Sequence, residues 1–118
     1  MFNEENNLKN TISKVSSELK ANDYNNYELI FVNDGSTDNT FFKAKELEKN
    51  NTQLKVIGYD VNQGRGKALR TGIDAANGDI ICTIDFDLTY HESHITRMIK
   101  ELEDNPTIDV VLASCYMP

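Results

Sequence analysis

Two aspartates, Asp85 and Asp87, follow a short apolar run and are separated by one phenylalanine. Because alternate residues leaving a strand point to the same side, the two carboxylates could reach one divalent cation. Hard oxygen ligands favour Mg²⁺ or Mn²⁺ over Zn²⁺. The alternative is that the two acidic residues solvate a loop, but no Lys or Arg lies near them in the sequence to neutralise them. We therefore expect a magnesium or manganese site at Asp85 and Asp87.

A group of opposite charge occupies residues 62–70, which read Asn-Gln-Gly-Arg-Gly-Lys-Ala-Leu-Arg. Its glycines let backbone approach a ligand, and the start of a helix attracts anions, as do Arg65, Lys67 and Arg70. The alternative is an exposed basic first turn, but cations there oppose the helix dipole unless an anion is bound. The glycine spacing fits neither a Walker loop nor a dinucleotide-binding fingerprint. The segment predicts an anion site, most simply for a diphosphate.

Polar clusters follow the carboxyl end of every predicted strand. In an open parallel sheet this is the edge at which ligands bind. Random placement would leave about half of the clusters at the other edge, so the distribution favours one shared binding edge. The clusters are residues 33–34, Asp60 with residues 64–67, residues 85–87, and residues 114–115.

Three further polar features have structural explanations. Residues 34–38 read as a turn and a helix N-cap before they read as a binding loop. His91 and His94 have a spacing that could hold a metal, but two surface histidines after a turn explain them as well. Cys82 and Cys115 have neither a CxxC pairing nor a histidine at ligand spacing, so we interpret both as reduced, structural cysteines.

The elements that must position these groups alternate between apolar runs of strand length and segments of helical period, which is typical of parallel βαβ units. The sequence therefore predicts an α/β fold in which buried strands of a parallel sheet are covered by helices on both faces. The predicted helices cover residues 4–21, 38–50, 67–76 and 93–103, and the predicted strands cover residues 27–32, 54–59, 79–85 and 109–113.

Two local expectations accompany this element order. Asn77 and Gly78 both accept the left-handed conformation of a C-terminal cap, so we expect them to close the third helix. The aromatic residues Tyr24, Tyr27 and 41–42 are expected in the core rather than in a stacking platform.

Composition narrows the function classes. The chain has 118 residues, which suits one domain over residues 1–118. Its net charge of −7 repels polyphosphate backbones, so nucleic acid is not an expected partner. There is no apolar run long enough to span a bilayer and no basic or apolar leader, so we expect a cytoplasmic domain.

Together these motifs resemble a family 2 glycosyltransferase of the GT-A fold, whose nucleotide-binding half is Rossmann-like. The order and spacing of the motifs agree along essentially the whole chain. Residues 87–92 with Ala113 and Ser114 further resemble the branch that transfers a hexose to polyprenyl phosphate. The motifs that carry the resemblance are residues 3–5, 31–38, 62–68, 76–81 and 85–88.

The resemblance implies a nucleotide-diphosphate sugar as donor and an inverting displacement assisted by Mg²⁺ or Mn²⁺. If the acceptor is a polyprenyl phosphate, it is already ionised near pH 7 and needs no strong general base. The implied donor contacts are Asn3, Glu5, Ser36, Asp60 and Asp85, with Asp34 near the base and Arg65 or Lys67 beside the diphosphate. The implied metal ligands are Asp85 and Asp87, with Thr89 nearby, and the implied catalytic residues are Asp87 and Arg65.

The chain departs from the family pattern at both ends. Family members usually begin with an apolar strand, normally central in the sheet, whereas this chain starts at Met1. It stops at Pro118, before the region that completes the acceptor pocket, and has Cys115 where relatives often have arginine. We therefore expect a truncated catalytic domain, the donor-binding portion, which retains donor binding and lacks turnover.

Two other classes compete with this prediction. One is a non-catalytic nucleotide-binding or assembly module derived from such a domain. The other is a phosphoacceptor receiver domain, which has similar length, acidity and α/β alternation. A receiver domain requires a lysine after its last strand, and here Ser114 and Cys115 occupy that place. The receiver domain is therefore the weaker alternative.

Overall fold

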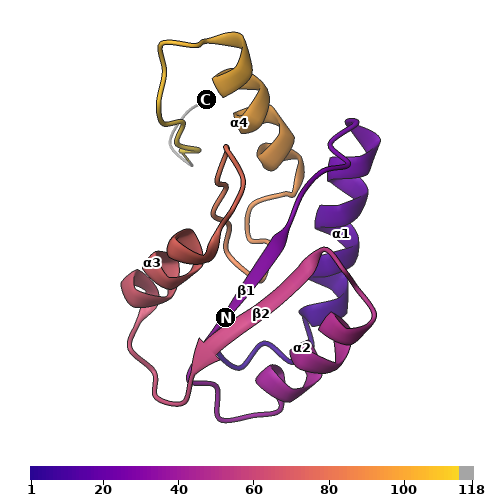
Figure 1. Ribbon diagram of the computed structural model, residues 1–118, viewed down its shortest axis with the longest axis vertical. Coiled ribbons are helices and arrows are strands. Elements are labelled where there is room, and N and C mark those ends of the chain that lie inside the picture. The colour runs from indigo at the N-terminus through magenta and orange to yellow at the C-terminus, as the bar shows by residue number, and fades with distance from the viewer. Residues whose placement is uncertain (115–118) are drawn as a thin grey trace.

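The computed structural model describes residues 1–114. Figure 1 shows two adjacent strands with helices on either side of them. The elements in chain order are α1 (Leu8–Ala21), β1 (Leu29–Asp34), α2 (Thr40–Lys49), β2 (Leu54–Tyr59), α3 (Arg65–Ala75) and α4 (Ser93–Asp104).

The two strands run parallel and pair over their whole length. Their register runs from Leu29 opposite Leu54 to Asp34 opposite Tyr59. Helix α2 makes the crossover between them, as a parallel connection requires. Because both strands end at the same edge, the loops that follow Asp34 and Tyr59 are neighbours. This confirms the predicted βαβ unit.

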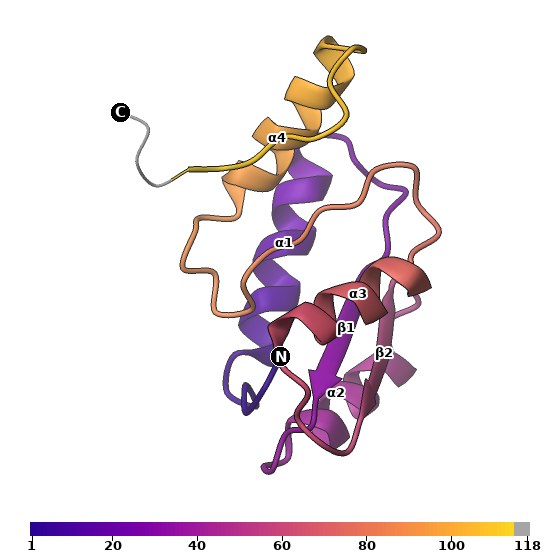
Figure 2. The same cartoon turned by 90° about the vertical axis from the view of Figure 1, so that its left-hand side faces the viewer.

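Helices cover both faces of the sheet, which confirms the predicted α/β fold class. Figures 1 and 2 show α3 on one side of the strands and α1 with α2 on the other. The α1/α2 face encloses a core that contains Leu8, Phe31, Ala44 and Val56. On the opposite face, Gly72 of α3 lies against Val32, where an added Cβ would come within 3.2 Å of a methyl carbon. Each fully buried aliphatic side chain contributes about 1.5–3 kcal/mol, so this small core dominates stability.

A second core joins α1 to α4. Val15 and Leu19 of α1 enclose Ile95 of α4 with Tyr24 and Tyr27 packed against them, as expected for these tyrosines. This cluster holds α4 against α1. It also brings the segment that precedes α4, which includes Leu88, next to α1. The expected burial of residues 41–42 is wrong, because Phe41 is 38% exposed and Phe42 is 68% exposed on α2.

The predicted strands at residues 79–85 and 109–113 are wrong, because both segments are irregular in the structure. Figure 2 shows the chain between α3 and α4 following an extended path without a neighbouring strand. A β-conformation is stabilised by ladder hydrogen bonds to a neighbour, and no described strand pairs with either segment. The isoleucines of residues 79–85 therefore stay at the surface, with Ile80, Ile81 and Ile84 each 40–47% exposed.

Met1 occupies the edge of β1 opposite β2. Its amino group donates to the carbonyl of Val32 at 2.7 Å, and its carbonyl accepts the N–H of Asp34 at 2.9 Å. This is the hydrogen-bond pattern of a parallel strand. Upstream of that point, the backbone of Ile30 faces the same edge, and no described residue pairs with it.

Three smaller expectations have different outcomes. Helix α3 does end near residue 76, but Asn77 and Gly78 are not left-handed. The end of α3 is instead held by Glu28, whose carboxylate accepts the N–H of Asn77. Cys82 is a free, exposed cysteine, and Cys115 lies outside the described residues. Within residues 1–114, the longest apolar helical stretch falls short of what a bilayer crossing needs.

Candidate functional site at the strand ends

Asp34 ends β1 and holds the loop that follows β2. Its carboxylate is buried and accepts the N–H groups of Gln63 at 2.8 Å and Gly64 at 3.1 Å. Burial acts to raise the pKa of Asp34, but these hydrogen bonds and the nearby hydroxyl of Tyr59 lower it below its usual value. Asp34 is therefore ionised at neutral pH and bonds to the protein itself.

Tyr59 is the residue of this cluster that sequence reasoning missed. Its hydroxyl is buried, and burial together with the carboxylate of Asp34 raises its pKa to about 12. The signal was available, because Tyr59 ends β2 directly opposite Asp34 in the strand register. A neutral tyrosine beside an ionised aspartate helps to keep that carboxylate in place.

Gly35 allows the loop after β1 to pack closely against the loop after β2. It has a φ of +65°, and an added Cβ would lie 2.2 Å from the backbone nitrogen of Asn62. The side chain of Asn62 also donates to the carbonyl of Asp34 at 3.1 Å. The loop after β1 thus packs directly on the loop after β2 and determines where α3 begins.

The basic glycine segment lies at the start of α3, as predicted, but the helix begins at Arg65 rather than at the predicted residue 67, with Gly64 at its N-cap position. Gly64 has a φ of +90°, and an added Cβ on Gly64 or Gly66 would meet nothing within 4 Å. The backbone therefore faces open space at a helix N-terminus, where an anion can approach. Lys67 is exposed in the same turn and makes no ion pair with a described residue.

The acidic segment is anchored between its two aspartates. The ring of Phe86 meets that of Phe31 edge-to-face at 4.8 Å, and its carbonyl accepts the hydroxyl of Thr11 at 2.7 Å. Asp87 is exposed, and its Oδ1 accepts the N–H and hydroxyl of Thr89 at 3.0 and 2.7 Å. These hydrogen bonds lower the pKa of Asp87, so its carboxylate is ionised and retains a second oxygen for a ligand.

The basic and acidic segments meet. Nη2 of Arg65 lies 3.0 Å from Oδ1 of Asp85, so the two motifs share one edge of the fold as the sequence predicted. The side chains are 77% and 42% exposed, respectively. Asp85 thus supplies the anion that Arg65 needs at the helix N-terminus.

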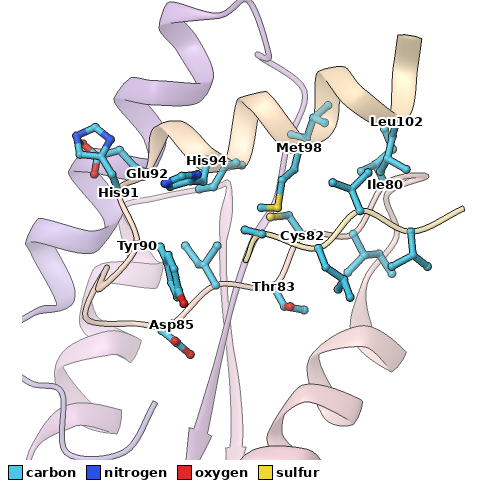
Figure 3. A pocket seen from close by; sticks show the side chains of 18 of the residues that line it. Ile80, Cys82, Thr83, Asp85, Tyr90, His91, Glu92, His94, Met98 and Leu102 are labelled. Carbon is cyan, nitrogen blue, oxygen red and sulfur yellow. The ribbon is translucent and has the colours of Figure 1, made fainter. Parts of the chain in front are cut away.

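A pocket of about 400 Å³ extends from this ion pair. Figure 3 shows Asp85 and Leu102 at opposite ends of it, with Met98 and Cys82 between. Most of its lining is aliphatic, contributed by the irregular segments 80–85 and 109–113 and by α4. The pocket is therefore mostly apolar, with the Arg65–Asp85 pair and the polar side chains of His91, Glu92, His94 and Asp109 also in its lining.

The other predicted donor contacts bond within the protein. Asn3 donates its N–H to Oγ of Ser36 at 3.1 Å, and Glu5 pairs with Lys43 of α2 at 3.0 Å. Asp60 is exposed in the loop after β2 and makes no hydrogen bond or ion pair with a described residue. The structure thus brings Arg65 and Asp85 together, while Asn3 and Glu5 bond to the loop after β1 and to α2.

A cation site is compatible with the carboxylates, although no cluster of three or more His, Cys, Asp or Glu residues forms among residues 1–114. Mg²⁺ commonly uses only one or two carboxylates, with substrate phosphates and water completing its shell. Asp85 and Asp87 each keep one oxygen that no described residue engages. His91 and His94 bond elsewhere, His91 to Ser93 at 2.9 Å and His94 edge-on to Tyr90.

A parallel α/β unit with charged loops at its strand ends belongs to the class of domains that bind ligands at that edge. The model of the family described as glycosyl transferase family 2 matches residues 1–117. The chain therefore belongs to glycosyl transferase family 2, which confirms the resemblance to that family.

Several curated proteins are similar to this chain. Dodecaprenyl-phosphate galacturonate synthase of Rhizobium johnstonii is 34% identical over 87% of the chain and 30% of its own length. Dolichol-phosphate mannosyltransferase of Pyrococcus furiosus is 30% identical over 98% of the chain and 31% of its own length. Poly-beta-1,6-N-acetyl-D-glucosamine synthase of Staphylococcus epidermidis is 32% identical over 93% of the chain and 26% of its own length. The chain spans less than a third of each of these relatives.

Proposed function

We propose that this domain binds a nucleotide-diphosphate sugar at the edge where Arg65 meets Asp85. The observation that carries the proposal is their 3.0 Å contact, because it puts a diphosphate-binding cation and a metal-binding carboxylate within reach of one pyrophosphate. The open space at Gly64 and Gly66 lets a ligand approach the N-terminus of α3. Lys67 supplies a second positive charge in that turn.

Asp85 and Asp87 would hold Mg²⁺ or Mn²⁺ in the loaded site. The cation, when bound, stabilises negative charge that develops on the departing nucleotide diphosphate. Arg65 contributes to the same stabilisation by donating to a diphosphate oxygen. Asp34 and Tyr59 act indirectly, since they hold the loop from which Arg65 projects. Asn3, Glu5, Ser36 and Asp60 remain candidate donor contacts.

The acceptor that we propose is a polyprenyl phosphate. Two of the similar proteins are named for dodecaprenyl and dolichol phosphate. The pocket beside Asp85 is largely aliphatic, which suits an apolar chain joined to a charged head. A phosphate acceptor is already ionised near pH 7, so an inverting attack on the sugar needs no strong general base.

Nucleotide titration tests the proposal. We would titrate the protein with UDP-glucose and GDP-mannose by calorimetry, with and without Mn²⁺, and repeat this with Asp87→Ala. The matched control is Asp74→Ala, which removes an exposed carboxylate from α3 outside the site. We expect Mn²⁺-dependent binding that Asp87→Ala abolishes and Asp74→Ala preserves.

Each other outcome has a distinct meaning. Binding without transfer or donor hydrolysis would favour the non-catalytic module. Absence of affinity for either nucleotide sugar, with Mn²⁺ present, would contradict the proposal. Binding that Asp87→Ala leaves intact would remove Asp87 from the site.

A further inference from the structure

We propose that Arg65 is a resident counter-cation that occupies Asp85 until a nucleotide diphosphate draws it away. Binding of the divalent metal ion and binding of the nucleotide would then be coupled through Arg65. The inference rests on the proposed function, because it assigns the coupling between the two ligands of that site. It concerns binding order and affinity, which the family membership does not specify.

The ion pair is placed to be exchangeable. Arg65 and Asp85 come from segments 20 positions apart and meet only through their side-chain tips, Nη2 to Oδ1. Both side chains reach solvent, and pairs of this kind are worth little to the fold. Opening the pair therefore costs little, and a better ligand for either partner can replace it.

The backbone under Arg65 stays in place when its side chain moves. Gly64, the residue before it, donates its N–H to the buried carboxylate of Asp34. The guanidinium stands at the end of a long flexible side chain and can turn from Asp85 to a nearby anion. A diphosphate would offer it bidentate hydrogen bonds and would also satisfy the positive end of the α3 dipole.

Arg65 and a divalent cation compete for the carboxylate of Asp85, because both are positively charged. One carboxylate oxygen faces Arg65, so a divalent cation that binds Asp85 meets a guanidinium a few ångströms away. Like charges at that separation repel, and the cation binds more weakly than it would to a free carboxylate. A diphosphate removes the repulsion by taking the guanidinium. By linkage, the cation then strengthens nucleotide binding by the same factor.

The decisive measurement uses Mn²⁺ alone, without nucleotide, because direct coordination of the diphosphate by the metal would also couple the two ligands. We would compare wild type, Arg65→Met and Arg97→Met by calorimetry and by Mn²⁺ electron paramagnetic resonance at about 0.15 M salt, where long-range charge effects are screened. Arg97 is the control, since it is an exposed arginine on α4 outside the pocket lining. Its loss changes the net charge equally.

We expect Mn²⁺ to bind about 3- to 5-fold more tightly to Arg65→Met than to wild type, the upper part of the range of an exposed charge contact. Arg97→Met should match wild type within about 2-fold. Arg65→Lys, which keeps the charge, should also stay near wild type. In Asp85→Asn, adding Arg65→Met should no longer tighten Mn²⁺ binding.

Equal Mn²⁺ affinity in wild type and Arg65→Met, including no measurable binding in either, would overturn the inference. Wild-type Mn²⁺-dependent nucleotide binding would in that case still support the proposed function. The opposite pattern of results also distinguishes the inference from the proposed function. Tighter Mn²⁺ binding to Arg65→Met, with no nucleotide binding in any variant, would support competition at Asp85 and contradict the nucleotide site.

Discussion

Nη2 of Arg65, the first residue of α3, lies 3.0 Å from Oδ1 of Asp85. Asp85 belongs to the irregular segment that follows α3 in the sequence. The contact joins the two motifs with the clearest chemistry, one cationic and one acidic. The contact also stabilises the start of α3, because a cation at a helix N-terminus is unfavourable without an anion beside it. In this chain the anion is supplied by Asp85.

The Arg65–Asp85 pair should matter for ligand binding and hardly at all for stability. Both side chains are substantially exposed, so we expect Arg65→Met and Asp85→Asn each to change the free energy of unfolding by less than about 1 kcal/mol. Nucleotide-diphosphate binding in Mn²⁺ should weaken in both variants. Urea unfolding and calorimetry check the two effects separately. A loss of several kcal/mol in stability would show that the pair is structural.

Asp34 should be a stability residue with an acid-dependent contribution. Asp34→Asn weakens charge-assisted hydrogen bonds to Gln63 and Gly64, so we expect a loss of about 1–3 kcal/mol at pH 7. The folded pKa of Asp34 lies below the unfolded one. Its contribution is therefore complete above the unfolded pKa, about 3.9, and disappears as pH falls through the folded pKa.

Urea unfolding of wild type and Asp34→Asn at pH 7, 5 and 3 measures this dependence. The difference between the two proteins should be the same at pH 7 and pH 5 and should shrink at pH 3. Asp60→Asn is the control, because Asp60 is exposed and unpaired among residues 1–114, and we expect a change within about 0.5 kcal/mol. A constant difference across this pH range would show that the carboxylate charge is not what Asp34 contributes.

Gly35 and Gly66 should respond oppositely to alanine. In Gly35→Ala the new Cβ would collide with backbone of the loop at Asn62, and φ is +65°, so we expect a loss of more than about 2 kcal/mol. In Gly66→Ala the Cβ meets open space within α3, so stability should be unchanged or rise by up to about 1 kcal/mol.

Thermal unfolding followed by circular dichroism compares the two alanine variants. Gly66→Ala should nevertheless reduce diphosphate affinity, since the methyl group would occupy the space beside the helix N-terminus. A destabilised Gly66→Ala, or a stable Gly35→Ala, would contradict the loop packing described above.

The edge of β1 beside Met1 should accept another strand. We expect that adding five alternating valine and isoleucine residues before Met1 raises the urea midpoint, because they can pair with the backbone of Ile30 and Val32 in the direction that Met1 already follows. Hydrogen exchange should slow at the amides of both residues. A five-residue Gly-Ser extension is the control. Equal midpoints for the two extensions would show that this edge is not a pairing site.

Local sequence patterns were sufficient for much of the fold. The apolar spacing of Leu8, Val15 and Leu19 predicts α1, and the run from Leu54 to Tyr59 has the bounds that the structure shows. The order of these elements implied parallel pairing, since a helix connects the strands. Residues 79–85 have the same apolar character as a strand, yet they are irregular, because strand formation depends on a neighbour that composition does not reveal.

For the candidate site, the sequence by itself determined which groups could do chemistry, namely the acidic triplet and the basic glycine segment, and it indicated that they share one edge. Tertiary structure decided their partners. Asp34 is committed to the loop at Gln63 and Gly64, and Arg65 is paired with Asp85. The physical reason is that residue type and spacing specify charge and local conformation, whereas contacts between distant segments depend on how loops pack after the helices and strands have formed.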